Sequence, residues 1–187
     1  MPTGYQVKEQ DKLYFITLQV VYWIDIFSRK RYRDIVIDSL KYCQTEKNVV
    51  IFAYVIMSNH VHLIVRSKNE TLSKTHGELK QYTSKQILKS IANEPESRRE
   101  WLLFMFERAA RKHKRNTKYQ FWTHENHAVL LYSDKFITER LHYIHHNPVR
   151  NGIVEKPEDY MYSSARNYAT LDAVLEIELL TFSWKTY

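Results

Sequence analysis

The spacing of hydrophobic and polar positions along the chain predicts four β-strands. Runs of β-branched and aromatic residues, such as LYFITLQVVYW at 13–23, are typical of buried strands. The short polar turn Ser58-Asn59 separates two such runs, VVIFAYVIM and HVHLIVR, which are therefore predicted to pair as a β-hairpin. The predicted strands are 13–23, 49–57, 60–66 and 127–132.

Segments with apolar residues three and four positions apart predict four helices. The predicted helices are 29–47, 71–92, 97–113 and a segment that begins at Ser133 or Asp134 and ends at Pro148. Ser97 followed by Glu100 is a capping-box pattern at the start of the third helix. Because Trp101 to Phe106 are apolar all round that helix, we expect it to be deeply packed or to lie at an interface.

The order of these elements predicts the fold class. A β-α-β-β-α series, an inserted helix and a final β-α unit indicate an α+β fold of the ferredoxin-like type, with an antiparallel sheet and helices packed on one face. A length of 187 residues suits one such domain. We predict a single domain over 1–154, with a helical insertion at about 95–120, and a tail over 155–187 packed on or beside it.

Composition adds a preference for a polyanionic partner. The formal net charge is +7, and 14% of the residues are aromatic. Bases stack on aromatic rings and phosphates meet Lys and Arg, so this composition suits single-stranded nucleic acid. A basic surface that serves only solubility is the alternative. The predicted phosphate contacts lie in a run without acidic residues and consist of Arg108, Arg111, Lys112, Lys114, Arg115 and Lys118.

Cysteine content and hydropathy indicate the compartment. The single cysteine, Cys43, allows neither a disulfide within the chain nor a Cys-rich zinc site, which suits a reducing cytoplasm. The apolar segment 13–27 is interrupted by Gln19 and Asp25 and is too short to span a membrane. No basic and apolar leader precedes it, so a cytoplasmic protein is expected.

The sequence His60-Val61-His62 lies on the third predicted strand and is a candidate metal site. Side chains two positions apart on a strand point to the same face, about 6–7 Å apart along it. Two imidazoles in that arrangement can hold one metal ion. The alternative is a pair of histidines of which one satisfies a structural hydrogen bond.

The last predicted helix carries a second candidate pair. Tyr143 and Asn147 are four residues apart and should project together from one face. A divalent metal on His60 and His62, completed by the Asn147 oxygen, could polarise a phosphodiester. Tyr143 could then attack as a nucleophile and form a phosphotyrosine bond. A purely structural tyrosine is the alternative in a chain with 14 of them.

Two stretches carry a family resemblance that extends over about residues 13–168. YVIMSNHVHLIV and QFWTHENHAVLLYSDKFITERLHYIHHNPVRNGIVEKPEDYMYSSARNY resemble the conserved segments of the REP-associated tyrosine transposases and related single-strand insertion-sequence transposases of the HUH type. The resemblance implies His60, His62 and Asn147 as the metal site, Tyr143 as the nucleophile, and Mg²⁺ or Mn²⁺ as the cofactor. It further implies a single-stranded DNA substrate, often with an imperfect hairpin, and a tyrosine joined to the DNA 5′-phosphate. Ser58 stands where the family often has Pro, and the inserted helix is longer than the minimal fold needs.

Other polar and aromatic residues near these motifs have two readings each. Histidines that flank the nucleophile could assist proton transfer but are more simply helix-end residues; they are His142, His145 and His146. The cluster before the fourth strand could support the metal site from outside its ligands; it comprises His124, Glu125 and His127. Arg150 is predicted to meet a phosphate. The tail tyrosines are expected to hold the tail on the domain rather than to stack on bases; they are Tyr160, Tyr162 and Tyr168.

Several functions stay open beside a metal-dependent transposase. The same motifs serve nicking relaxases and replication initiators, which usually carry further domains. A domesticated, non-catalytic module that binds hairpin DNA or RNA would need none of His60, His62 and Tyr143. A metal-dependent hydrolase without a covalent intermediate would retain activity after Tyr143→Phe. The sequence leaves a monomer and a homodimer both open, and it does not define the DNA site.

Overall fold

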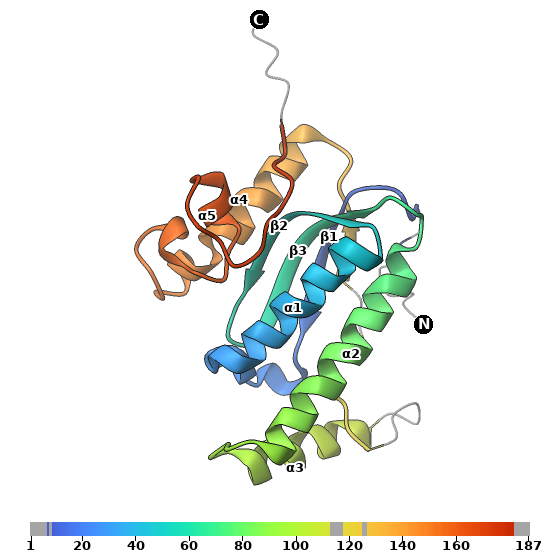
Figure 1. Cartoon of the computed structure of the whole chain (residues 1–187), viewed down its shortest axis with the longest axis vertical. Coiled ribbons are helices and arrows are strands. Elements are labelled where there is room, and N and C mark those ends of the chain that lie inside the picture. The colour runs from blue at the N-terminus through green and yellow to red at the C-terminus, as the bar shows by residue number, and fades with distance from the viewer. Residues whose placement is uncertain (1–6, 8, 113–117, 125–126, 182–187) are drawn as a thin grey trace, which may run out of the picture.

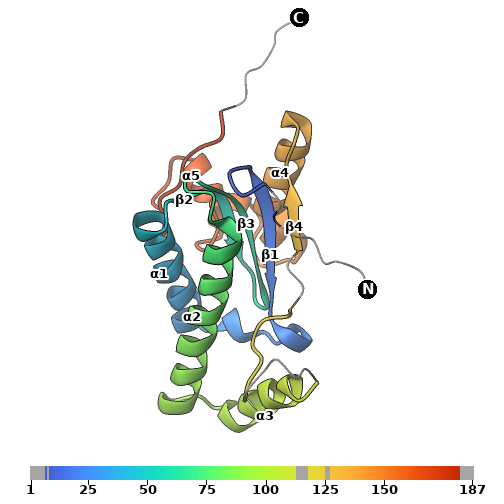
Figure 2. The ribbon, with the colours of Figure 1, turned by 90° about the vertical axis from the view of Figure 1, so that its right-hand side faces the viewer.

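A four-stranded antiparallel sheet forms the centre of the molecule (Figures 1 and 2). The computed structural model describes residues 7, 9–112, 118–124 and 127–181. The strands are β1 (Tyr14–Gln19), β2 (Val49–Ile56), β3 (His60–Ser67) and β4 (His127–Leu130), in the order β2-β3-β1-β4. This arrangement confirms the predicted α+β class and antiparallel sheet, and β3 lies inside the sheet between β2 and β1.

The strand register positions the polar residues of the central strands. Thr17 of β1 lies opposite His62, and Gln19 lies opposite His60. On the other side of β3, Val55 of β2 also lies opposite His62. Because successive side chains alternate between the two faces, this register places Thr17 and both histidines on the same face of the sheet.

Helices cover both faces of the sheet (Figure 2). α1 (Lys30–Glu46) and α2 (Leu72–Asn93) pack on one face, as a ferredoxin-like plan requires. α4 (Asp134–Arg150) lies on the opposite face, so the expectation that helices would occupy a single face is wrong for this helix. The reason is visible in β2, where all eight residues are buried, because such a strand must be covered on both sides.

α3 (Arg99–Ala110) extends the molecule beyond the end of the sheet (Figure 1). Its predicted capping box is wrong, because the helix begins two residues after Ser97 and no side chain caps it. The preceding loop is instead held by buried Glu96, which pairs with Arg29 at 3.2 Å and with Arg31 at 2.8 Å. Leu102 and Phe106 are buried, whereas Trp101 and Phe104 are about half exposed, so one side of the helix is packed and the other faces solvent.

α4 begins as predicted and ends later than predicted. The Ser133 hydroxyl accepts a hydrogen bond from the backbone N–H of Phe136 at 3.3 Å, which is the expected N-cap contact. Pro148 was expected to end the helix but lies inside it, two residues before Arg150. A proline there removes one intrahelical hydrogen bond, and the last turn closes through Asn151 N–H to the Asn147 carbonyl at 3.1 Å.

The segment after α4 packs against β2 and α1. It contains two short helices, η3 (Pro157–Asp159) and α5 (Ala165–Tyr168). The tyrosine hydroxyls donate to Ile56 O (Tyr160, 2.8 Å), Asp34 Oδ1 (Tyr162, 2.8 Å) and Phe52 O (Tyr168, 3.1 Å). These contacts hold the segment on β2 and α1. In the part of the chain that the structure describes, no helix has the length and hydrophobicity needed to cross a bilayer.

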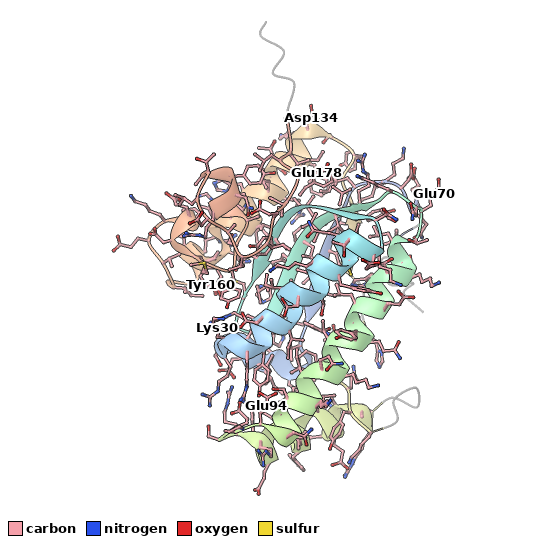
Figure 3. All side chains as sticks on the ribbon, viewed as in Figure 1. Lys30, Glu70, Glu94, Asp134, Tyr160 and Glu178 are labelled. Carbon is pink, nitrogen blue, oxygen red and sulfur yellow. The ribbon has the colours of Figure 1, made fainter. Side chains whose placement is uncertain are left out.

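The residues labelled in Figure 3 mark positions along the long axis of the molecule. Asp134, at the start of α4, lies near one end, and Glu94, just after α2, lies near the other. Lys30 marks the start of α1, and Tyr160 lies close to it in this view.

Candidate active site

His60 and His62 lie side by side on β3, on the face that α4 covers. Their ring centroids are 4.6 Å apart. Val61 between them is fully buried in the core cluster of the opposite face, as strand alternation predicts. The His62 ring stacks on Phe15 of β1 with a centroid distance of 5.1 Å, which fixes its plane. The predicted pair therefore shares one face at a distance at which both imidazoles can bind one ion.

Each histidine has a hydrogen-bonding partner for its Nδ1 atom. His60 Nδ1 lies 2.7 Å from Asn59 Oδ1, and His62 Nδ1 lies 2.9 Å from the Thr17 hydroxyl. The Asn59 amide oxygen can only accept, so His60 carries its proton on Nδ1. The same tautomer of His62, donating to Thr17, leaves both Nε2 lone pairs for a metal. Such supporting contacts are how ligand histidines are oriented.

Burial keeps both imidazoles neutral. It lowers the pKa of His60 to about 4 and that of His62 to about 3, and for His62 the charges of His60 and Arg140 act in the same direction. Neutral imidazole is the form that binds metal. Two neutral, oriented nitrogen donors therefore fit a divalent cation. Among the described residues, no group of three His, Cys, Asp or Glu side chains is arranged to hold such an ion.

α4 brings Tyr143 to the histidines. The Tyr143 ring lies 5.3 Å from the His62 ring and 6.1 Å from the Phe15 ring, measured between centroids. The guanidinium of Arg150 lies 5.3 Å from the centre of the Tyr143 ring. A nucleophile candidate, two metal-ligand candidates and a cation thus meet between β3 and α4, although the sequence separates them widely.

Asn147, the predicted third ligand, is hydrogen-bonded to the residue that follows α4. It is buried, and its side-chain oxygen accepts a hydrogen bond from the Asn151 amide at 2.9 Å. The same Asn151 amide group also donates to the Asn147 backbone oxygen at 2.8 Å. To act as a ligand, the Asn147 oxygen must share or exchange this contact.

The neighbouring histidines of α4 make other contacts. His145 Nε2 lies 2.9 Å from the Ser164 hydroxyl and its ring packs against Tyr168. His142 and His146 stack on each other at 3.7 Å. These contacts favour the simpler reading of helix residues that hold the surrounding structure. Of the cluster before β4, Glu125 and the side chain of His127 lie outside the described residues.

The predicted DNA-binding residues are only partly described. Lys114 and Arg115 lie outside the described residues. Arg108, Arg111, Lys112 and Lys118 are exposed. Arg111 pairs with Glu107 at 2.8 Å, whereas Lys112 lies over the Tyr22 ring at 5.0 Å. The exposed Lys and Arg side chains keep this end of α3 basic.

Sequence reasoning missed the residues that support the histidines. Thr17, Phe15 and Arg140 contact the site across strands or from α4, so only the strand register reveals them. Asn59 could have been found, because it directly precedes His60. Trp23, whose ring lies 6.3 Å from that of His60, lies in a turn after β1, where the predicted strand 13–23 was wrong.

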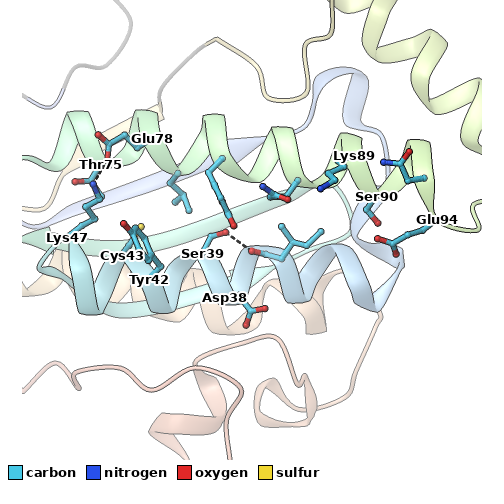
Figure 4. A pocket seen from close by; sticks show the side chains of 15 residues that line it. Asp38, Ser39, Tyr42, Cys43, Lys47, Thr75, Glu78, Lys89, Ser90 and Glu94 are labelled. Atoms are coloured by element: carbon cyan, nitrogen blue, oxygen red, sulfur yellow. Dashed lines mark hydrogen bonds and ion pairs between the residues drawn. The ribbon is translucent and has the colours of Figure 1, made fainter.

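A groove of about 830 Å³ lies between α1 and α2, on the opposite face of the sheet (Figure 4). Figure 4 shows Cys43, Tyr42 and Ser39 along α1, with Ser90 and Lys89 on α2. Burial raises the pKa of the Cys43 thiol to about 11, so it is not a reactive thiolate. The groove contains none of the proposed catalytic residues.

In this fold, a strand that carries two neighbouring histidines faces a helix that carries a tyrosine. The chain belongs to the family of IS200-like transposases, which it matches over residues 12–109. This match includes both histidines of β3 and ends before α4. A search of curated proteins gave no match.

The fold is similar to that of a solved REP-associated tyrosine transposase bound to a REP hairpin. The TM-score is 0.64 at 17% sequence identity, over 98% of this chain and 96% of that one. A likeness at this identity shows the shared fold, and it extends over α4 and the segment that follows.

Proposed function

We propose that this protein is a metal-dependent, single-tyrosine transposase that cleaves and rejoins single-stranded DNA. The observation that carries the proposal is the position of the Tyr143 ring, 5.3 Å from His62 and beside the His60–His62 pair. Mere binding of DNA requires neither a tyrosine beside two histidines nor hydrogen bonds that orient those histidines. Membership of the IS200-like transposase family supports the same chemistry.

The Nε2 atoms of His60 and His62, with the side-chain oxygen of Asn147, would hold Mg²⁺ or Mn²⁺. When bound, such an ion withdraws charge from a phosphodiester and orients it. The Asn59 oxygen keeps His60 in the tautomer that ligation needs, and the Thr17 hydroxyl can accept from His62 Nδ1 to favour the same tautomer there. Phe15 packs against both His62 and Tyr143 and so fixes their mutual geometry.

Tyr143 would supply the nucleophile. Its phenolic oxygen gives up a proton and forms a bond to phosphorus, while the bond from phosphorus to the 3′ oxygen breaks and that oxygen leaves as a hydroxyl. The 5′-phosphate is then joined to the tyrosine. Attack by a second 3′-hydroxyl reverses the exchange, restores a phosphodiester and frees Tyr143. Because the number of phosphoester bonds is unchanged, rejoining needs no ATP.

Cations beside this centre would position the strand. Arg150 lies over the Tyr143 ring, where its guanidinium can meet a phosphate oxygen. The basic residues at the end of α3 would add contacts that set affinity rather than sequence choice. The solved transposase of similar fold is bound to a REP hairpin, which supports a hairpin-containing single strand as the substrate. We further propose that residues 1–154 form a single domain on which the tail packs. The protein would act in the cytoplasm, as a monomer or a homodimer.

Covalent trapping tests the proposal directly. The protein is incubated with labelled single-stranded DNA from the flanks of its gene, with Mn²⁺ or with chelator, and analysed on denaturing gels. We expect a shifted band that requires both metal and Tyr143. Tyr143→Phe is the test variant, and Tyr82→Phe on α2 is the matched control. Tight binding without an adduct on any flank strand would favour a hairpin-binding module. Undiminished DNA cleavage by the Tyr143→Phe variant would favour a hydrolase without a covalent intermediate.

A further inference from the structure

The turn after β1 holds two aromatic residues in a conformation that side chains rarely adopt. Tyr22 has a φ of 55° and Trp23 a φ of 56°, both in the left-handed region. Together with Val21 they form the short helix η1 (Val21–Trp23). Their side chains are also unusually open to solvent, with 66% of Trp23 and 38% of Tyr22 exposed. Backbone strain that presents an exposed indole is not explained by core packing.

The turn is fastened directly to the metal-ligand candidates. The Asn59 side chain donates to the Trp23 carbonyl at 3.3 Å, and its oxygen is the atom that bonds His60 Nδ1. The Trp23 ring meets the His60 ring edge-on, with centroids 6.3 Å apart. Val21 N–H donates to the Phe121 carbonyl at 2.9 Å, which holds the other side of the turn. The indole is therefore fixed beside the proposed catalytic centre.

A cation completes this surface. Lys112, two residues after the end of α3, lies over the Tyr22 ring at 5.0 Å. Exposed rings combined with a neighbouring cation are what proteins use to hold single strands, because bases stack on rings while phosphates meet the charge. Other exposed rings, such as Tyr82 on α2 and Phe104 on α3, lie on elements other than β3, which carries His60 and His62.

We infer that Trp23 is a positioning residue that stacks on the base of a nucleotide beside the scissile phosphate. The inference rests on the proposed function, because the scissile phosphate is placed by His60, His62 and Tyr143. Stacking on an indole beside His60 would hold the strand while leaving its phosphate free for Tyr143. Since every base has a π-face, Trp23 would fix the position of the strand with little choice of base.

Equilibrium binding to strands with single abasic sites tests this inference. The Tyr143→Phe protein is titrated, in chelator, with labelled flank-strand oligonucleotides that carry an abasic site at each successive position. We expect Trp23→Ala to lower affinity roughly 5- to 150-fold. At one position the missing base should weaken binding by a similar factor when Trp23 is present and have little effect in Trp23→Ala. Trp23→Phe should retain much of the affinity.

Two further variants separate stacking from folding. Trp23→Gly removes the ring and suits the left-handed backbone, so its thermal unfolding temperature should not fall although its DNA affinity does. Tyr82→Ala removes a similarly exposed ring from α2 and should bind as the parent does. If Trp23→Ala binds every strand like the parent, if abasic penalties are equal in both proteins at all positions, or if the parent binds no single strand, the inference is overturned.

The two proposals fail in different ways. A metal-dependent adduct on Tyr143, without any coupling between Trp23 and a base, would leave the transposase function standing and remove the stacking role. Coupling without an adduct on any strand would retain the stacking role as strand binding and remove strand transfer.

Discussion

The ring of Tyr143 on α4 lies 5.3 Å from the ring of His62 on β3, although α2, α3 and β4 separate them along the chain. The contact exists because α4 crosses the face of the sheet that carries both histidines. The Phe15 ring packs against both, with centroid distances of 5.1 Å to His62 and 6.1 Å to Tyr143. The consequences of this arrangement can be measured residue by residue.

Thr17→Val should weaken metal binding while preserving the fold. The substitution keeps the shape of the side chain but removes the hydroxyl 2.9 Å from His62 Nδ1. Loss of such a supporting contact typically lowers metal affinity about 10- to 100-fold. The measurement is the Mn²⁺ concentration that gives half-maximal cleavage. Thr45→Val on α1 is the isosteric control, and an unchanged Mn²⁺ requirement in Thr17→Val would show that the contact does not orient the ligand.

Asn147→Ala and Asn151→Ala should have different effects on activity. If Asn147 supplies a metal oxygen, its removal raises the Mn²⁺ requirement. Asn151→Ala frees the Asn147 oxygen from its 2.9 Å hydrogen bond and should leave that requirement equal or lower. Both variants lose the hydrogen bond between the two side chains, and Asn151→Ala also loses the bond from its amide to the Asn147 backbone oxygen. Each lost hydrogen bond should cost about 0.5–1.5 kcal/mol of stability. Equal Mn²⁺ requirements in both would assign Asn147 a structural role only.

Metal removal should separate cleavage from binding. Chelator is expected to abolish the covalent adduct while leaving affinity for the single strand within about threefold, since cations of the protein supply most of that affinity. Mn²⁺ should support faster cleavage than Mg²⁺ at equal concentration, because imidazole nitrogens suit Mn²⁺ better than the oxygen-preferring Mg²⁺. A gel series with each ion measures this order. Adduct formation in chelator would contradict the metal requirement.

Glu96→Gln should destabilise the protein near neutral pH and reduce its sensitivity to acid. Burial opposes the charge, but the Arg98 backbone N–H, the Tyr32 hydroxyl and Arg29 outweigh it and hold the pKa of Glu96 at about 2. Because this pKa lies below the ordinary 4.5, the stabilisation is present above pH 4.5 and is lost as pH falls towards 2. We expect a loss of roughly 2–3 kcal/mol at neutral pH.

Urea unfolding between pH 7 and pH 2 measures this effect. The stability of wild type and Glu96→Gln should converge as the pH approaches 2. Glu139→Gln, at an exposed position of α4, is the control and should leave the curve unchanged within about 0.5 kcal/mol. Parallel curves at all pH values would mean that Glu96 contributes through packing rather than charge.

The sequence by itself determined the elements and half of the site. Periodicity placed all four strands and the long helices within a few residues, because alternation and helical spacing are local properties. The same local rule put His60 and His62 on one face. Local signals failed where distant partners compete: Glu96 replaced the Ser97 cap by bonding to α1, and the packed last turn of α4 tolerated Pro148.

Only the tertiary structure decided which residues meet the histidines. The strand register brought Thr17 to His62, and the choice of sheet face for α4 brought Tyr143 there. No local pattern encodes that face, because both faces of β2 are apolar and either could accept a helix. The left-handed turn that presents Trp23 is equally non-local, since Asn59 and Phe121 hold it from other parts of the chain. The second apolar face of the sheet must be buried, and this is the physical reason that α4 packs there and brings Tyr143 to the histidines.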